Sequence, residues 1–475
     1  MVRTRYAPSP TGFMHIGNLR TALYEYLIAK AAGGVFVLRI EDTDRERYVP
    51  GAEDAIFDTL QIHGLNFDEG PGVGGEYGPY VQSERKDGYM PHAKKLIENG
   101  SAYLCFCDKE RLDSLKDESG YKKYDRACQK ISDGERASML SGGAPYVVRQ
   151  YIPEGRTVFF DEVYGEISME NSEMEDQVLI KSDGMPTYNF ANVIDDNAMK
   201  ITHVVRGSEY LTSTPKYKLL YDALGFTVPK FIHLPLLQNH MGQKISKRHG
   251  DASVLELIGK GFLPEAILNY AALLGWSPGG SKEIFSLSEL VEEFRCTGIS
   301  KSPSTFDIKK LTWVNCEHIK LMTDEAFFEK AKPNIMEAVK TPGVDYRKLA
   351  ANVKSRISFL HEINSLLDFI DALPPYDIGL FYHKKMKTDP DIAKKALTLV
   401  YDALVELETF THESVMTALA ETATSNGLTK GQVLWSVRTA ASGKPETPCG
   451  AAEICEILGK TETLKRIKHG LEKLM

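Results

Sequence analysis

Apolar residues at the start of the chain recur first at helical spacing and then in a continuous run. Residues 3–7 predict a short strand, which the prolines of the following Pro-Ser-Pro segment end. A helix is expected from about Gly17 to Ala32, and Gly33-Gly34 stops it. Its apolar stripe consists of Leu19, Ala22, Leu23, Tyr26 and Leu27. The apolar run Val35–Ile40 is typical of a strand inside a parallel sheet. Strand, helix and strand at this length predict a right-handed βαβ unit.

The pattern changes twice further along the chain. From about 82 to 187 the segments are short and mix Cys, Tyr and charged residues, which indicates an insertion between two halves of the sheet. Strand patterns return at Val204-Val205 and Phe231–Leu237, and after about 250 the periodicity is almost all helical. Pro374-Pro375 predicts a hinge in this helical part. We therefore expect a multidomain protein: an α/β Rossmann-like parallel sheet with an α+β insertion, followed by an all-α C-terminal part.

Composition narrows the class of protein without identifying it. The 475 residues are 43% hydrophobic and 26% charged, which is ordinary for a soluble globular chain of roughly three domains. No apolar run is long enough to span a bilayer, and Met1–Arg5 lacks the apolar core of a secretion signal, so a cytoplasmic protein without membrane partners is expected. The seven cysteines then favour free thiols or a metal site over disulfides.

Net charge does not exclude a nucleic-acid partner. The chain carries a formal charge of −8, but residues 326–475 contain 20 Lys and Arg against 19 Asp and Glu. An acidic protein can still bind RNA through a local basic face.

The loop that leaves the first predicted strand carries a candidate phosphate site. It runs through Pro-Ser-Pro-Thr-Gly to His15-Ile16-Gly17-Asn18, at the start of the predicted helix. Ligands of open parallel sheets bind beyond the carboxyl ends of the strands, and a helix N-terminus presents unpaired N–H groups to a phosphate. Gly12 and Gly17 permit close approach of the backbone, and His15 can donate to a phosphate oxygen. The alternative is a turn in which His15 only caps the helix.

A second candidate lies far along the chain, in Lys244-Ile245-Ser246-Lys247-Arg248. Three cations in five residues, between Gly242 and Gly250, can close over a triphosphate and stabilise developing charge. The alternative is a solvated basic loop.

These segments resemble one family closely. The stretches RYAPSPTGFMHIGNLRTALYEYLIAKAAGGVFVLRIEDTD, SDGMPTYNFANVIDD, VRGSEY and KISKR are similar to those of bacterial glutamyl-tRNA synthetases, members of the class I aminoacyl-tRNA synthetases. The resemblance covers nearly the whole chain and is loose after 325. His15–Asn18 is similar to the HIGH signature and Lys244–Arg248 to the KMSKS signature; Asn18 departs from the final His of the first.

The resemblance implies a role for each matching residue. Catalysis would involve His15, Gly17, Asn18, Lys244 and Lys247; ATP binding would involve Ser9, His15, Gly17, Glu209 and Lys247; glutamate binding would involve Arg5, Ser9, Glu41, Tyr188, Asn192 and Arg206. Arg5 would hold the side-chain carboxylate of glutamate and Glu41 its amino group. These residue types suit the task, because a guanidinium matches a carboxylate in bidentate fashion. Glutamine would aim N–H donors at the all-donor arginine and leave buried groups unpaired.

The insertion also carries a candidate zinc site. Cys105-Phe106-Cys107 and Cys128 supply three thiolates, and a closed tetrahedral site needs one more donor. Some glutamyl-type synthetases carry zinc here, with a histidine two residues after the last cysteine; in this chain that position is Lys130. In a related short paralogue the fourth ligand is a tyrosine four residues before the last cysteine, which corresponds to Tyr124. The alternative is three ordinary thiols.

The resemblance divides the chain into five parts: 1–81 and 188–250 as halves of the Rossmann catalytic domain, 82–187 as the acceptor-binding insertion, 251–325 as a stem-contact helical domain, and 326–475 as an anticodon-binding part with a hinge near 374. Seven Lys and Arg residues in the last part could form a basic face for RNA: Lys354, Arg356, Lys384, Lys385, Lys387, Lys394 and Lys395. Arg356 lies roughly where one family member senses the third anticodon base.

The implied activity is that of a monomeric glutamate–tRNA ligase. It would use ATP with Mg²⁺ to form glutamyl-adenylate and transfer glutamate to tRNA(Glu), usually only with tRNA present. Whether tRNA(Gln) is charged as well stays open. A glutamine-charging synthetase would have C-terminal β-barrels, and the short paralogue would lack an anticodon part. A small-molecule nucleotidyltransferase would not need the helical C-terminal third, and a non-catalytic RNA-binding protein would not need two ATP signatures.

Overall fold

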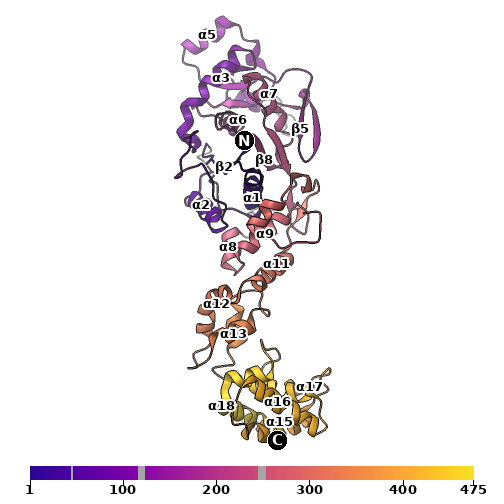
Figure 1. Ribbon diagram of the computed structural model, residues 1–475. Coiled ribbons are helices and arrows are strands. Elements are labelled where there is room, and N and C mark those ends of the chain that lie inside the picture. The colour runs from indigo at the N-terminus through magenta and orange to yellow at the C-terminus, as the bar shows by residue number, and fades with distance from the viewer. Residues whose placement is uncertain (44–46, 116–123, 244–252) are drawn as a thin grey trace. The chain divides into compact units, whose positions relative to one another are not determined.

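The computed structural model describes residues 1–43, 47–115, 124–243 and 253–475 (Figure 1). The chain forms two compact units, residues 1–311 and 312–475, each with a hydrophobic core of its own. Unit 1 contains the parallel sheet and its insertion, and the described part of unit 2 is helical. The fold class expected from the sequence is therefore confirmed. The unit boundary falls within the predicted stem-contact segment, and the five-part division stays a prediction.

The first βαβ unit forms where the periodicity predicts it. Strand β1 (Arg3–Tyr6) pairs in parallel with β2 (Val35–Leu38), and helix α1 (Ile16–Ala31) connects them. The helix is buried on almost every side, so a single apolar stripe understates its burial. Tyr24 and Glu25 are fully buried although they lie off the predicted stripe, whereas Tyr26 is only half-buried.

The second half of the sheet lies beside β1. Strands β8 (His203–Gly207) and β9 (Lys230–Leu234) are parallel, and the Thr202 N–H donates to the Arg3 carbonyl at 2.9 Å next to β8. The predicted strand 231–237 stops at Leu234 because Pro235 cannot donate to the ladder. The chain continues in β10 (Leu237–Gln238), which pairs with β11 (Ser304–Thr305).

The insertion is not separate from the sheet. Its strands β3 (Ala102–Cys105), β4 (Val147–Gln150) and β7 (Val178–Ile180) form one small sheet. The hairpin of β5 (Arg156–Asp161) and β6 (Gly165–Glu170) instead extends the sheet of the second half, in the order β6-β5-β9-β8.

A buried hydrogen-bonded pair, Asp161 and His233, fastens this hairpin. The Asp161 carboxylate accepts from His233 Nδ1 at 2.6 Å, from the His233 N–H at 3.1 Å and from the Val163 N–H at 2.9 Å. Both side chains of the pair are completely buried. Asp161 and His233 are far apart in the sequence, so no local sequence pattern predicts their contact.

Helices account for most of the remaining chain. In unit 1 they are α2 (Ala52–Ile62), α3 (Tyr89–Glu98), α4 (Lys109–Asp113), α5 (Asp133–Ser141), α6 (Tyr188–Ala198), α7 (Thr214–Leu224), α8 (Val254–Gly259), α9 (Pro264–Leu273) and α10 (Leu287–Glu293), with 3₁₀ turns η2 (Gln82–Gly88), η3 (Ala127–Lys130), η4 (Asn171–Glu173), η5 (Ser208–Tyr210) and η7 (Cys296–Gly298). Helix α11 (Ile308–Leu321) crosses the unit boundary. No helix in the described ranges is long and apolar enough to cross a membrane.

Unit 2 contains α12 (Asp324–Ala338), α13 (Tyr346–Val353), α14 (Glu362–Leu367), η8 (Ile378–Phe381), α15 (Pro390–Val405), α16 (His412–Ser425), α17 (Lys430–Ser442) and α18 (Ala451–Lys473). The last four helices pack around one core (Figure 1). Arg466 links the two sides of the segment predicted as a hinge near residue 374. Its guanidinium donates to the carbonyl of Phe369, before that segment, at 2.7 Å and to the carbonyl of Ala441, after it, at 2.8 Å.

Candidate active site and metal centre

A cavity of about 330 Å³ lies where β1, β8 and β9 end. Three successive parallel strands of the sheet thus deliver their carboxyl ends to one place, as expected for a ligand site of an open α/β sheet. The wall includes most of the residues predicted from the sequence: Arg5, Ser9, His15, Gly17, Asn18, Tyr188, Arg206 and Glu209.

His15 lines this cavity and is the N-cap of α1. Its Nδ1 accepts from the N–H of Gly17 at 3.0 Å and of Asn18 at 3.3 Å, while Asn18 Oδ1 accepts from the His15 N–H at 3.3 Å. Because Nδ1 accepts, the proton of a neutral ring lies on Nε2. The cap therefore also sets the tautomer that can donate to a phosphate. A Cβ at Gly17 would lie 2.9 Å from the His15 ring, so a larger residue would displace the ring.

The loop between β1 and α1 is held by backbone bonds from downstream residues. The Glu41 N–H donates to the Pro8 carbonyl and the Val49 N–H to the Pro10 carbonyl, both at 3.0 Å. Ser9, between these anchors, is exposed and lies on the cavity wall.

Arg5 lines the same cavity beside Glu25, in the middle of α1, and is 4% exposed. Two carboxylates fix its guanidinium: Nε donates to Asp196 Oδ1 at 3.0 Å and Nη1 to Glu25 Oε1 at 2.9 Å. Nη2 makes no hydrogen bond to the described residues. Burial alone would raise the pKa of Asp196, but the guanidinium groups of Arg5 and Arg39 outweigh burial and hold it below its usual range. The site therefore contains an oriented, charged arginine with one amino group left for a ligand.

Glu41 is buried behind this arginine and is not on the cavity wall. Arg39 donates to Glu41 Oε1 from Nη2 at 2.8 Å and from Nε at 3.2 Å. Arg39 also donates from Nη1 to Asp196 at 2.7 Å. Glu41 Oε2 is buried with no hydrogen-bond partner in the described structure. Asn192, likewise off the wall, donates to the Tyr188 carbonyl at 2.9 Å.

Arg206 supplies a second guanidinium beside Arg5. It lines the cavity, is 6% exposed, and packs against the rings of Tyr210 at 5.3 Å and Tyr217 at 5.0 Å. Its Nε and Nη1 are buried without a hydrogen-bond partner in the described structure. A buried guanidinium held by aromatic faces keeps capacity to bind an anion.

Sequence reasoning missed three members of this charge cluster: Glu25, Arg39 and Asp196. The sequence did contain a signal for Glu25. It is a charged residue between Ala22 and Ile28, in a helix that is apolar on most sides and is therefore expected to be buried, and burying a charge costs free energy. Nothing local indicated that the three would meet around Arg5, because they come from α1, the residue after β2, and α6.

Lys244 and Lys247, predicted to contact ATP phosphates, lie outside the described residues. The chain leading to them turns at Asn239–Gln243, where the Asn239 N–H donates to the Gln243 carbonyl at 2.8 Å.

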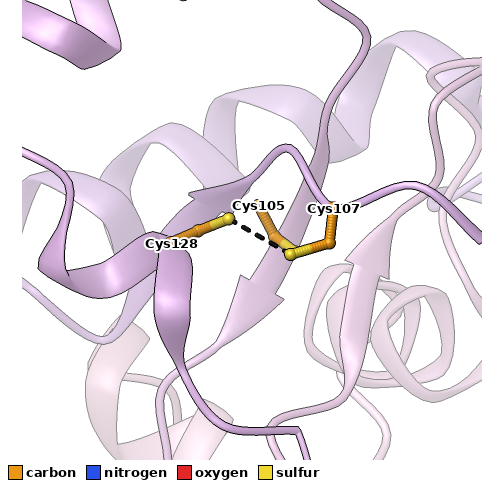
Figure 2. Close-up of side chains that lie close together, drawn as sticks. All are labelled: Cys105, Cys107 and Cys128. Carbon is orange, nitrogen blue, oxygen red and sulfur yellow. Dashed lines mark hydrogen bonds between the residues drawn. The ribbon is translucent and has the colours of Figure 1, made fainter. Parts of the chain in front are cut away.

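The three cysteines of the insertion meet as the sequence spacing predicts. Figure 2 shows the side chains of Cys105, Cys107 and Cys128 pointing toward one another, and their sulfur atoms lie within 4.8 Å of each other. Cys107 Sγ lies 3.5 Å from Cys128 Sγ. The Tyr124 hydroxyl joins the cluster, 3.3 Å from Cys105 Sγ and 3.5 Å from Cys107 Sγ.

Unit 2 has a larger cavity, of about 810 Å³. Its wall includes Arg356, Trp435 and Arg438. The Arg438 guanidinium lies over the Trp435 ring at 4.2 Å and donates to Thr447 Oγ1 at 3.2 Å. Five of the predicted basic-face lysines are exposed: Lys384, Lys385, Lys387, Lys394 and Lys395. Lys354 instead forms an ion pair with Asp324 at 2.8 Å.

Two family models match the chain. Residues 1–313 match the catalytic domain of class I tRNA synthetases (E and Q), and residues 326–471 match an anticodon binding domain.

Relatives and solved structures match along the full length. The glutamate–tRNA ligases of Clostridium kluyveri and Clostridium novyi are 53% and 52% identical, covering 100% of this chain and 98% of each relative. A crystal structure of a glutamate tRNA ligase from Elizabethkingia meningosepticum, in complex with its amino acid, matches with a TM-score of 0.91 at 35% identity over 100% of both chains. A glutamate-tRNA synthetase from Elizabethkingia anophelis matches with a TM-score of 0.88, also at 35% identity and over 99% of both chains.

Proposed function

We propose that this chain, which belongs to the class I tRNA synthetases for glutamate and glutamine, is a glutamate–tRNA ligase. The α-carboxylate of glutamate attacks the α-phosphorus of ATP, and pyrophosphate leaves as glutamyl-adenylate forms. The 2′-hydroxyl of the terminal tRNA adenosine then attacks the acyl carbon, and AMP leaves. Both steps need orientation and charge stabilisation rather than a protein nucleophile.

One observation carries this proposal: a single cavity is lined both by the N-terminus of α1 and by two arginines, of which Arg5 is paired with Glu25 farther along the same helix. Glutamyl-adenylate has a matching pair of groups, a phosphate near its middle and a carboxylate at one end. The N-terminus of α1 and His15 Nε2 suit the phosphate. Arg5 and Arg206 suit the carboxylate.

ATP, supplied as its magnesium complex, would lie along the loop and the start of α1. We assign this contact to Ser9, His15, Gly17, Asn18 and Glu209, which share the cavity wall. Lys244 and Lys247 are proposed to neutralise the phosphates from the second signature.

Glutamate would bind with its side-chain carboxylate at Arg5 and Arg206, beside Tyr188. The amino group is proposed to approach Glu41, whose Oε2 has no other partner in the described structure. Asn192 would act through Tyr188, to whose carbonyl it donates. Glutamine fits the same shape, but its amide cannot accept two charge-assisted bonds from a guanidinium.

The cysteine cluster fits a structural zinc ion. Tetrahedral coordination with Zn–S of about 2.3 Å places sulfur atoms roughly 3.8 Å apart, close to the spacing of Cys107 and Cys128 at 3.5 Å. Tyr124 would supply the fourth donor. A closed site of this kind stabilises the fold when the ion is bound.

Zinc content tests this assignment directly. The purified chain should contain about one zinc ion, measured by atomic absorption, and Cys128→Ser should lose most of it. Cys296→Ser is the matched control, because Cys296 lies outside the cluster. The zinc content of this variant should equal that of the parent. A parent chain without zinc after expression in zinc-supplemented medium contradicts the assignment.

The helical unit 2 is proposed to bind the tRNA anticodon. An unstacked base can lie against an aromatic ring and an arginine, and the cavity wall provides Trp435, Arg438 and Arg356.

Charging of radiolabelled glutamate onto purified tRNA(Glu) and tRNA(Gln), with glutamine as a control substrate, tests the proposal. Transfer to tRNA(Glu) alone establishes a discriminating ligase, and transfer to both establishes a relaxed one. Transfer of glutamine in preference to glutamate, or no transfer by folded protein, contradicts the proposal.

A further inference from the structure

Strands β1 and β8 lie beside each other without a backbone ladder between them. The Thr202 N–H donates to the Arg3 carbonyl next to β8, but the described structure contains no backbone hydrogen bond between β1 and β8 themselves. Each strand pairs on its other side, β1 with β2 and β8 with β9. The backbone groups that face this gap therefore need other partners, because buried N–H and C=O groups are almost always hydrogen-bonded.

The side chain of Glu25 enters this gap from helix α1. Its Oε1 accepts from the Val205 N–H of β8 at 3.1 Å and from Arg5 Nη1 of β1 at 2.9 Å. Arg5 Nη1 also donates to the Val205 carbonyl at 3.4 Å. All three residues line the cavity, and Glu25 is fully buried. One carboxylate oxygen thus joins α1, β8 and the arginine proposed to bind the substrate carboxylate.

These bonds decide which way the Arg5 guanidinium points. Nη1 is held by Glu25 and the Val205 carbonyl, and Nε donates to Asp196 Oδ1 at 3.0 Å. A planar guanidinium held at two of its nitrogens cannot turn without breaking one of these bonds. Without the bond to Glu25, the bond to Asp196 would be the main restraint left. The orientation matters, because a displacement of about 1 Å in a positioning contact can cost roughly 100-fold in rate.

We propose that Glu25 is a positioning residue for Arg5, and that its contribution to glutamate binding depends on the placement of its acceptor oxygen rather than on its charge. This inference rests on the proposed glutamate–tRNA ligase function, in which Arg5 holds the side-chain carboxylate of the substrate. Glu25 acts through Arg5 and not by contact with the substrate. It keeps Nη1 engaged, so that Nη2 is the nitrogen left for the ligand, and the same oxygen satisfies the Val205 N–H.

Two substitutions separate placement from charge. Glu25→Gln keeps the length and an acceptor oxygen but removes the carboxylate, whereas Glu25→Asp keeps the carboxylate and is shorter by one methylene. In tRNA-dependent ATP–pyrophosphate exchange, the glutamate KM should stay within about threefold of the parent for Glu25→Gln and rise at least about tenfold for Glu25→Asp. The KM for ATP and the kcat at saturating glutamate should change little, because only a binding contact of glutamate is weakened.

Thr4→Val is the matched control. Thr4 Oγ1 donates to the backbone carbonyl of Glu25 at 2.8 Å, so this variant removes a buried bond between β1 and α1 and leaves the Glu25 side chain in place. It should lower the unfolding temperature, because a buried hydrogen bond is lost. Its glutamate KM should equal that of the parent.

Hydrogen–deuterium exchange gives a second measurement that does not depend on activity. The Val205 N–H donates to Glu25, so the peptide that contains Val205 reports on this bond. Followed by mass spectrometry, its exchange should be as slow in Glu25→Gln as in the parent and faster in Glu25→Asp. Equal exchange in all three proteins overturns the proposal.

The kinetic results have equally clear opposite outcomes. A glutamate KM that rises as much in Glu25→Gln as in Glu25→Asp, or more, overturns the proposal, because charge then matters at least as much as placement. An unchanged KM in Glu25→Asp, or an equal rise in Thr4→Val, overturns it as well. Each of these results leaves the proposed function standing if the parent transfers glutamate to tRNA(Glu). Absence of that transfer contradicts the proposed function instead.

Discussion

The cavity of unit 1 and the cavity of unit 2 are built in opposite ways. The first, of about 330 Å³, has charged side chains that are almost completely buried: Arg5, 4% exposed, is held by two carboxylates, and Arg206, 6% exposed, packs against two tyrosine rings. The second, of about 810 Å³, has Trp435 and Arg438 half-buried and Arg356 exposed. A ligand in the first cavity meets charged groups enclosed by protein, whereas a ligand in the second meets side chains that are partly open to solvent.

The difference suits two tasks. Separating glutamate from glutamine requires charge placed accurately in a dry site, because the two molecules have nearly the same shape. Reading an RNA base requires a large aromatic surface and hydrogen-bond donors, and each contact can contribute on its own. Single substitutions should therefore have large, selective effects in the first cavity and smaller ones in the second.

The largest effect is expected at Arg5. Arg5→Ala removes the proposed carboxylate anchor and leaves Glu25 and Asp196 without their guanidinium, so the glutamate KM should rise at least about 100-fold. The KM for ATP should change much less, and pyrophosphate exchange with tRNA present measures both. Arg5→Lys keeps a charge and should retain part of the affinity. An equal rise of the two KM values would show that Arg5 is not the anchor.

His15 separates capping from phosphate binding. Both His15→Ala and His15→Asn remove Nε2 and should lower kcat/KM for ATP by about 100-fold, the effect of losing one donor to a developing charge. Asn can cap a helix, so only the alanine variant should also lose about 1 kcal/mol of stability. Thermal unfolding and exchange kinetics measure the two effects. Full activity of His15→Asn would leave the cap as the only role of the ring.

Trp435 tests the second cavity. Trp435→Ala should raise the KM for tRNA about tenfold, since stacking of one base contributes roughly 1–3 kcal/mol. The KM for glutamate at saturating tRNA should stay within about twofold of the parent. Tyr382→Ala is the control, because Tyr382 is 66% exposed and outside the cavity wall. A tRNA KM that is the same in all three proteins would contradict base binding at Trp435.

The smallest effect concerns stability at Glu25. Its pKa rises from 4.5 to about 8 on folding, so its contribution to stability is present below pH 4.5 and is lost as the pH rises through 8. Glu25→Gln does not titrate at this position. Its unfolding temperature should therefore rise by a few degrees relative to that of the parent as the pH goes from 5 to 8. Thermal scans at the two pH values check this. A constant difference would show that Glu25 is ionised throughout.

Much of the fold could be predicted because its signals are local. The βαβ unit follows from strand and helix periodicities with turn residues between them, and the stop at Gly33-Gly34 is in place. The strand at 231–237 was predicted too long: Pro235 already ended it, and Leu237 pairs elsewhere. The β5–β6 hairpin was unpredictable as part of the catalytic sheet, because its pairing with β9 joins segments about 70 residues apart.

The predictions for the candidate site divide in the same way, into those with a local signal in the sequence and those without one. His15 lies on the cavity wall at the end of β1, and the three cysteines lie close to one another, each as expected. Strand ends fix the first position and short sequence spacing fixes the second. Glu41 and Asn192, predicted to bind glutamate, are buried and not on the cavity wall; Glu41 accepts from Arg39 and Asn192 donates to the Tyr188 carbonyl. Their proposed roles depend on distances that no motif contains.

The sequence by itself determined the parallel sheet, the phosphate-type loop at its edge, the three-cysteine cluster and the helical C-terminal part, because each depends on residues near one another in the chain. Only the tertiary structure decided which charged groups meet at the cavity of unit 1. Arg5, Glu25, Asp196 and Arg206 come from four separate elements and Arg39 directly follows a fifth, β2. Coulomb energy depends on their distance and burial rather than on their order in the sequence. For that reason the sequence did not single out Glu25, although it is fully buried and paired with Arg5 on the cavity wall.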